Sequence, residues 1–383
     1  MKTSREGIRT ERSAFGFFQP LEKRRRFFPR IGNLPRLASA TVVIFLSNLA
    51  LCLGGNWDGD NPAGNFSYHN NWYSNSQPTW GSGNTHYFSY RNNASQTSLY
   101  YDYGSWVACL DFIYESTFGA GLPLDGNGNG INVYGKLENQ GSYSQTINIP
   151  ISMKTSSAQI NPVNGNLTFN NYVYNNSNWI NVWGNNGKTL ALYGVLSDAG
   201  GLAVKENSTV ILANDNTFSG GIWVEKGTVR LQTHTNAVGT GSVNVGTNAT
   251  LDINYGAVHV RGVALTLYNG KVSKTVTGST YWDGAFTNYN SSTVSVSAGN
   301  FIIISNMSLN SGTLVFSNVF NSGMNGGTMT GSGNLIKQGL GAFFLFPGTH
   351  SGNIDLYQGE IRQFTGTMPG SGILTMSTAT TYR

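Results

Sequence analysis

Cysteine is nearly absent from this chain of 383 residues, which contains only Cys52 and Cys109. Cys52 lies in an apolar N-terminal stretch typical of a secretory signal, so the mature chain is expected to keep only Cys109. A single thiol can build neither a disulfide framework nor a cysteine-based metal cluster. Packing and backbone hydrogen bonds must therefore stabilise the fold.

Charged side chains are also scarce, at 11% of all residues. The formal net charge of +5 arises in residues 1–36, because 13 basic residues face 15 acidic ones in the remainder of the chain. The part after this leader is slightly acidic and lacks the basic surface that binds phosphate backbones. No nucleic-acid partner is therefore expected.

The sequence lacks the common catalytic fingerprints, including GxSxG, the P-loop, the Rossmann motif and HExxH. No cofactor and no enzymatic activity are predicted. One candidate catalytic pair is Asp215 with His234, since stacked coils would bring residues about 20 positions apart together. An Asx-turn for Asp215 and a solvated His234 are the alternatives.

What the chain does contain is glycine, at 49 residues, together with short apolar runs of period two between Asn- and Gly-rich turns. This pattern predicts strands rather than helices. Only the stretch from Val107 to Phe118 is compatible with a short helix. The predicted strands include runs at 147–151, 167–169, 190–192, 210–212, 222–224, 229–231, 258–260, 263–267, 294–296, 301–304 and 314–316.

An internal repeat joins two segments of the chain, residues 201–231 and 333–362. At a constant offset of 132 residues the identical positions are Lys205 and Lys337, Thr217 and Thr349, Ser219 and Ser351, Gly220 and Gly352, and Gly227 and Gly359. Repeats of this kind are typical of solenoids. We therefore predict an all-β fold, a right-handed parallel β-helix, over a flat β-sandwich, which explains the repeat less well.

The first copy carries a recognisable motif. Residues 216–221 read NTFSGG, residues 227–229 read GTV, and NAVGTG follows at 236–241. These residues resemble the autotransporter-associated β-strand repeat of autotransporter passenger domains and other large bacterial surface proteins. In the second copy, Gly348 and His350 replace the Asn and the aromatic residue of the motif. The resemblance implies a β-helical architecture and says little about activity.

The chain is expected to consist of three parts: a leader (1–55), an aromatic-rich N-terminal cap (56–125) and the solenoid (126–383). The leader has a basic run at 23–26 followed by an apolar run at 37–53, which predicts export by the Sec or twin-arginine route and cleavage near residues 50–56. The protein is thus expected to be secreted or associated with the outer membrane. Membrane contact would come only through the leader or a missing C-terminal region.

Aromatic side chains are concentrated in the predicted cap. Its four tryptophans are Trp57, Trp72, Trp80 and Trp106. Such rings can stack on the faces of sugars, which predicts a carbohydrate site. The alternative is a structural cap that covers the first open coil, as terminal repeats require. The predicted partners are extracellular polysaccharide or the surface of a host or neighbouring cell.

A calcium loop is a further candidate. Asp125, Asn127 and Asn129 have the alternating oxygen spacing of such a loop, but Lys136 occupies the twelfth position, where a bidentate acid is expected. An Asn-Gly turn between strands is the alternative. Together the sequence predicts an exported, non-enzymatic, structural or adhesin-like β-helix, with a carbohydrate-binding or polysaccharide-degrading β-helix as the alternative.

Overall fold

The computed structural model of the chain describes residues 56–57, 66, 78–88, 99–118, 121–364, 371–377 and 380–383. The chain divides into the units Met1–Leu51 and Cys52–Arg383, and all described residues belong to the second. The predicted leader and its cleavage site therefore lie outside the described residues, apart from Asn56. Within the described part, no helix is long and apolar enough to cross a membrane.

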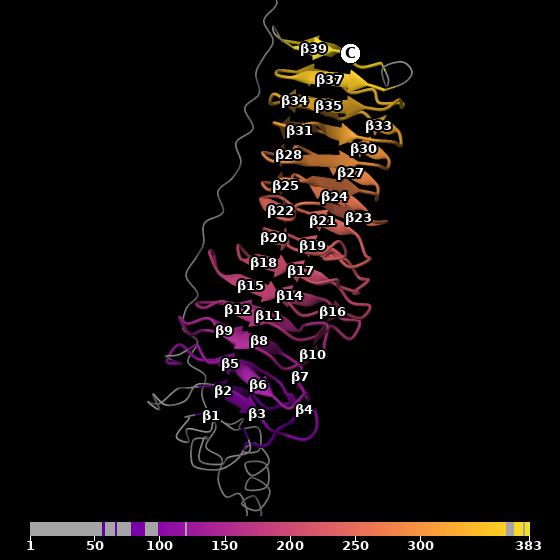
Figure 1. The fold of residues 1–383 in the computed structure, drawn as a ribbon. Coiled ribbons are helices and arrows are strands. Elements are labelled where there is room, and N and C mark those ends of the chain that lie inside the picture. The colour runs from indigo at the N-terminus through magenta and orange to yellow at the C-terminus, as the bar shows by residue number, and fades with distance from the viewer. Residues whose placement is uncertain are drawn as a thin grey trace, which may run out of the picture. The chain divides into compact units, whose positions relative to one another are not determined.

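The described residues form parallel strands that stack as a β-solenoid of about 13 turns (Figure 1). The all-β parallel β-helix predicted from the sequence is confirmed. The first of its sheets, sheet A, contains β1 (Asn56–Trp57), β2 (His86–Phe88), β5 (Phe112–Tyr114), β8 (Lys136–Asn139), β11 (Gln159–Pro162), β14 (Ile180–Val182), β17 (Leu202–Val204), β19 (Ile222–Val224), β21 (Val243–Val245), β24 (Leu265–Tyr268), β27 (Phe286–Tyr289), β30 (Met307–Leu309) and β33 (Met329–Gly331).

Sheet B follows sheet A in each coil. Its strands are β3 (Leu99–Tyr101), β6 (Leu124–Gly126), β9 (Gln145–Ile147), β12 (Leu167–Phe169), β15 (Thr189–Leu192), β18 (Thr209–Leu212), β20 (Gly227–Leu231), β22 (Ala249–Ile253), β25 (Lys271–Lys274), β28 (Ser292–Val296), β31 (Thr313–Asn318), β34 (Asn334–Gln338), β36 (Ile354–Leu356) and β38 (Leu374–Met376).

Sheets C and D share the third face of the coil. Sheet C contains β4 (Val107–Cys109), β7 (Ile131–Val133), β10 (Ile151–Met153), β13 (Val173–Tyr174) and β16 (Leu196–Ser197). Sheet D contains β23 (Val258–Val260), β26 (Ser279–Trp282), β29 (Asn300–Ile303), β32 (Ser322–Met324), β35 (Ala342–Leu345), β37 (Glu360–Gln363) and β39 (Thr381–Tyr382). Between the two sheets, residues 213–221 and 232–242 cross this face as loops.

The strands form because apolar and polar residues alternate, so that one side of each strand faces the interior. In β31 every second residue is buried, beginning with Leu314, and β18 buries Val210 and Leu212 in the same way. Burial of this apolar surface stabilises each coil by about 25 cal/mol per Å². Neighbouring coils supply the backbone hydrogen-bond partners, so the inner strands have no open edge.

The stretch from Val107 to Phe118 does not form a helix, so the prediction of a possible helix there is wrong. It contains β4 and β5, which pair with β7 and β8 of the following coil. Val107, Ile113 and Tyr114 belong to the β-branched and aromatic types that favour strands. Pairing with the next coil decides the conformation of this stretch. The sequence of the stretch alone does not contain that information.

The segment predicted as a cap supplies strands to the same sheets as the solenoid. A cluster of aromatic rings fills its interior, where Phe66 lies 5.5 Å from Phe88 and Phe88 lies 4.4 Å from Phe112 between ring centroids. All three rings are buried. The aromatic residues thus widen the core of the first coils.

The two repeat copies lie on different faces of the solenoid. In residues 201–231, the strand pairs β17–β18 and β19–β20 each run from sheet A to sheet B. At the matching positions of residues 333–362, β34–β35 and β36–β37 each run from sheet B to sheet D. The repeated unit is therefore two strand pairs joined by a loop, displaced by one face around the coil between the copies.

Candidate functional site

A groove of about 460 Å³ lies on the outer surface of sheet C. Sheet pairing aligns Asn132, Ser152 and Tyr174 in one outward column, because their neighbours in the strands point into the core. Four further residues come from the ends of these strands and the adjoining turns. The groove is lined by Trp106, Asn132, Ser152, Lys154, Tyr174, Asn176 and Asp198.

Aromatic rings form one wall of the groove. The indole of Trp106 lies over Gly130, where a Cβ atom would come within 2.8 Å of its Cη2 and Cζ3 atoms. The ring centroid of Trp106 is 6.1 Å from that of Tyr174, and Tyr174 stacks on Tyr172 at 5.7 Å with an interplanar angle of 11°. Trp106 is 39% exposed and Tyr172 is 46% exposed, so ring surface is open to solvent.

Polar side chains form the other wall. Nζ of Lys154 donates to Oδ1 of Asn176 at 3.0 Å, and Nδ2 of Asn176 donates to Oγ of Ser152 at 2.6 Å. The backbone N–H of Asn176 donates to Oδ2 of Asp198 at 3.1 Å. This network holds the side chains in place, and Lys154 and Asp198 contribute one positive and one negative formal charge to the groove.

The backbone beside the groove adopts an unusual conformation. Asn176, Ser177 and Asp198 have φ angles of 49°, 63° and 82°, in the left-handed region that residues other than glycine rarely occupy. Local strain of this kind persists where the surroundings fix it, and it clusters at binding sites. These three residues lie on adjacent coils at one corner, and Asn176 and Asp198 also line the groove.

The chemistry of this groove suits a polar ligand with an apolar face. Its volume falls within the range of small-molecule sites, about 300–1,000 Å³. A sugar ring could lie on Trp106 or Tyr174, while its hydroxyl groups exchange hydrogen bonds with Lys154, Asn176 and Asp198. The groove thus offers binding contacts for carbohydrate.

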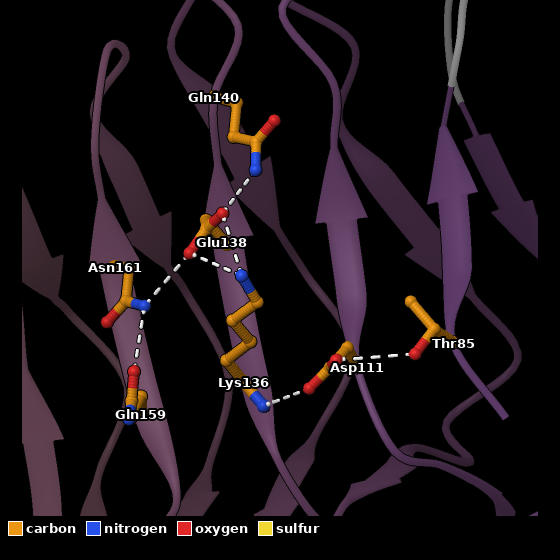
Figure 2. A network of polar contacts seen from close by, with 7 residues as sticks. All are labelled: Thr85, Asp111, Lys136, Glu138, Gln140, Gln159 and Asn161. Carbon is orange, nitrogen blue, oxygen red and sulfur yellow. Dashed lines mark hydrogen bonds and ion pairs between the residues drawn. The ribbon is translucent and has the colours of Figure 1, made fainter. Parts of the chain in front are cut away.

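A polar network occupies the outer surface of sheet A near its N-terminal end (Figure 2). Glu138 on β8 lies at its centre, and its carboxylate contacts Nζ of Lys136 at 3.0 Å and Nδ2 of Asn161 at 3.0 Å. The amide of Gln140 also donates to Glu138. Directly before β5 of the preceding coil, Oδ1 of Asp111 accepts from the backbone N–H of Lys136 at 2.8 Å.

Glu138 remains ionised at neutral pH in this environment. Burial by itself would raise the pKa of Glu138, but hydrogen bonds from Gln140, Asn161 and Lys136, together with the Lys136 charge, outweigh it and lower the pKa. The donors occupy both carboxylate oxygens. Such a carboxylate is suited to joining the neighbouring coils that contain β8 and β11. It is poorly suited to proton transfer, which needs a pKa near the working pH.

The predicted pair of Asp215 and His234 does come together on adjacent loops of the third face. Nδ1 of His234 lies 3.5 Å from Oδ2 of Asp215, and the side chains are 42% and 54% exposed. Oδ1 of Asp215 also accepts from the backbone N–H of Asn236 at 3.3 Å. A similar pair lies further along this face, with Nε2 of His259 3.9 Å from Oδ2 of Asp283. Both pairs are open to solvent.

The structure separates the predicted sugar-stacking tryptophans. Trp106 lines the groove, whereas Trp80 packs against the core, with its ring 4.0 Å from His86 and 5.9 Å from Phe66. Burial lowers the pKa of His86 to about 4. Trp72 and the side chain of Trp57 lie outside the described residues. The position of Trp80 fits the capping interpretation better than a sugar platform.

The three calcium candidates lie on a strand and the turn that follows it. Oδ1 of Asp125, on β6, accepts from Nδ2 of Asn148 at 2.6 Å. The amides of Asn127 and Asn129 both donate to the carbonyl of Tyr103, at 2.8 and 3.4 Å. All three side chains thus contact neighbouring coils. Within the described residues, no group of three His, Cys, Asp or Glu side chains could hold a metal ion; the calcium site stays a prediction.

Sequence reasoning missed most of the residues around the groove. Tyr172, Lys154 and Asn176 belong to segments that look like ordinary strand ends and turns. One signal was available, because the sequence carries two tyrosines two positions apart, Tyr172 and Tyr174, which a strand presents on one face. Their partners come from other coils, and the coil length that aligns them was unknown.

Comparisons of the chain with models of known protein families, with characterised proteins and with solved structures found no match in any of the three. The similarity to the autotransporter-associated repeat therefore stays a prediction from the motif at residues 216–221.

Proposed function

We propose that the protein is an exported structural β-solenoid of the bacterial cell surface or extracellular space, with an adhesive rather than an enzymatic role. The leader sequence supports export, and the motif at 216–221 supports a relation to autotransporter passenger domains. A stack of about 13 coils presents polar turns and outward side chains at regular intervals. Many weak contacts along such a scaffold can combine into strong attachment.

We further propose that extracellular polysaccharide is the partner, and that the groove on sheet C binds it. The observation that carries this proposal is the partly exposed ring of Trp106 in the same groove as the network of Lys154, Asn176 and Asp198. An aromatic face next to fixed donors and acceptors is the arrangement that a sugar ring requires. Attachment to a host or neighbouring cell would then proceed through its surface glycans.

Titration of the full chain with soluble polysaccharides, followed by calorimetry, tests this function. Trp106→Ala and Tyr174→Ala should each weaken binding by about tenfold or more, which corresponds to about 1.4 kcal/mol. Tyr193→Ala is the matched control, because Tyr193 is 45% exposed and does not line the groove. Equal affinities of the wild type and Trp106→Ala would rule out the groove as the binding site.

The same samples test the non-enzymatic part of the proposal. After prolonged incubation, no new reducing ends and no unsaturated sugar products are expected. If products form and are lost in His234→Ala or Asp215→Asn, the chain is instead a polysaccharide-degrading enzyme that uses the pair on the third face.

A further inference from the structure

A second aromatic site lies on the outer surface of sheet A, on a different face from the groove. It is a slot of about 290 Å³ that spans strands β14, β17 and β19. None of its residues was singled out as a sugar candidate by the sequence. The slot is lined by Trp179, Asn181, Ala203, Lys205, Trp223 and Glu225.

The walls of the slot are two indole rings and its floor is an alanine. Sheet pairing places Ala203 directly between Asn181 and Trp223. Trp179 lies over Gly201, where a Cβ atom would come within 2.9 Å of its Cε3 and Cη2 atoms. A larger side chain at either small residue would close the slot, so Gly201 and Ala203 are what keep it open.

The polar groups of the slot lie beside the rings. Lys205 forms an ion pair with Glu225 on the next coil, so the charges compensate each other. Within the described part of the chain, nothing hydrogen-bonds with the side-chain amide of Asn181, which remains available to a ligand. A neutral ligand with hydroxyl groups fits these partners better than a charged one, because no unpaired charge faces it.

Aromatic rings continue beyond the slot along the same sheet. Trp223 lies 5.7 Å from Tyr268 on β24, and Tyr268 stacks on Tyr289 of β27 at 5.2 Å with an interplanar angle of 2°. Successive strands of a sheet are about 4.8 Å apart. Two coils separate Trp179 from Trp223 and two more separate Trp223 from Tyr268, whereas Tyr268 and Tyr289 lie on successive coils and cover each other's ring faces.

We propose that this slot binds one pyranose ring of a neutral polysaccharide, held between the indoles of Trp179 and Trp223. The inference rests on the proposed carbohydrate binding. It adds a second site on another face, so that one solenoid can hold two polysaccharide chains.

The test uses the full chain and two probes, a neutral hexasaccharide of glucose units and an oligogalacturonate of the same length. Calorimetry is run on the wild type, Trp106→Ala, Trp179→Ala, Trp223→Ala and Ala203→Leu. Ala203→Leu fills the floor without removing an aromatic ring. Trp183→Ala is the matched control, since Trp183 directly follows β14, is 43% exposed and does not line the slot.

In the Trp106→Ala background, binding of the neutral hexasaccharide is expected to persist. Adding Trp179→Ala, Trp223→Ala or Ala203→Leu should weaken it about tenfold or more, while Trp183→Ala should leave it unchanged. The oligogalacturonate should bind the slot more weakly. Tighter binding of the charged probe would overturn the assignment of a neutral ligand.

The outcomes separate the slot from the groove. If binding disappears in Trp106→Ala and is unchanged in Trp179→Ala and Trp223→Ala, the slot proposal is wrong and the groove proposal is supported. Binding that depends on the slot residues and ignores Trp106→Ala supports the slot and overturns the groove. If neither probe binds the wild type and a wider set of polysaccharides also fails, both proposals are wrong.

Discussion

At the residue scale, buried polar side chains form hydrogen bonds with backbone groups at the corners of the coil, where the strand ladder does not supply a partner. Lys337 is fully buried, and its Nζ donates to the carbonyls of Gly339 at 2.6 Å, Gln338 at 2.7 Å and Gln358 at 3.2 Å. Burial lowers the pKa of Lys337 to about 8. The pKa of Lys274, also buried, is lowered for the same reason.

Lys337→Met should change how stability depends on pH. Between pH 8 and the ordinary lysine value of 10.5, the unfolded chain binds more protons than the folded one at this site, so the free energy of unfolding rises with pH in the wild type. One such group contributes a slope of up to about 1.4 kcal/mol per pH unit. Denaturant unfolding at pH 8, 9 and 10 should show a smaller slope in the variant.

The control for this prediction is Lys271→Met, because Lys271 is an exposed lysine on the same strand as Lys274. It should keep the slope of the wild type. Lys274 remains in both variants, so some pH dependence persists. An unchanged slope in Lys337→Met would show that Lys337 does not titrate in this window.

Asn216, in the repeat motif, joins three coils. Its Oδ1 accepts from the backbone N–H of Leu196 at 2.8 Å, and its Nδ2 donates to the carbonyl of Ala237 at 2.7 Å. Asn216→Ala leaves the N–H of Leu196 and the carbonyl of Ala237 without these hydrogen bonds. Each buried group left unpaired lowers the free energy of unfolding by about 1–3 kcal/mol. We expect a loss of about 2–4 kcal/mol in the free energy of unfolding, measured by denaturant titration. Thr217→Ala, at an exposed neighbour, should stay within about 0.5 kcal/mol of the wild type.

The sequence predicted some of these residue environments and missed others. It aligned Lys205 with Lys337, yet Lys205 pairs with Glu225 near the surface while Lys337 is buried among carbonyls. The difference arises because the two copies lie on different faces of the coil. A residue's surroundings in a solenoid depend on the coils above and below, which the local motif does not specify.

At the element scale, period-two alternation located the strands well. The runs at 210–212, 222–224 and 229–231 correspond to β18, β19 and β20. Alternation could not assign strands to sheets, since coil length varies from 18 residues between Ala342 and Glu360 to 31 between Asn56 and Tyr87. For this reason the aromatic residues that meet at the groove and the slot were not predicted together.

Gly348 occupies the position of Asn216 in the second copy and meets a different constraint. It pairs with Met329, and a Cβ atom there would lie 1.7 Å from the carbonyl oxygen of Met329. Gly348→Ala should therefore destabilise the C-terminal coils by about 1–3 kcal/mol, since backbone must move to relieve the overlap. Thermal unfolding followed by circular dichroism checks this.

Gly104→Ala is the control for Gly348→Ala, because no atom lies within 4 Å of the corresponding Cβ position. It should unfold at the temperature of the wild type. A Gly348→Ala variant of undiminished stability would mean that the loop at 346–353 can shift away from β33 at little cost.

At the scale of the whole molecule, each coil contacts mainly its neighbours, so stability is close to a sum over coils and their interfaces. Leu265 pairs with Phe286, and residues 265–285 therefore form one complete coil that contains β24, β25 and β26. Deletion of this coil would place β21 against β27 with Val243 opposite Phe286, in an unchanged register.

Deletion of residues 265–285 should leave a folded, monodisperse solenoid with the β-type circular dichroism of the wild type. Deletion of residues 265–274 removes only β24 and β25 and should prevent correct stacking, because β26 of sheet D would then follow directly on β23 of the same sheet, with no strands of sheets A and B between them. Size-exclusion chromatography and circular dichroism distinguish the two. Equal folding of both variants would argue against a coil-by-coil organisation.

The displacement of the repeat by one face has a consequence for how such a protein can grow. A repeated segment need not span a whole number of turns, because its strands can pair with the sheet on the next face of the coil. Residues 201–231 and 333–362 occupy two such placements, one on sheets A and B and one on sheets B and D. Insertion of a further copy could thus lengthen the solenoid even where the copy does not span whole turns.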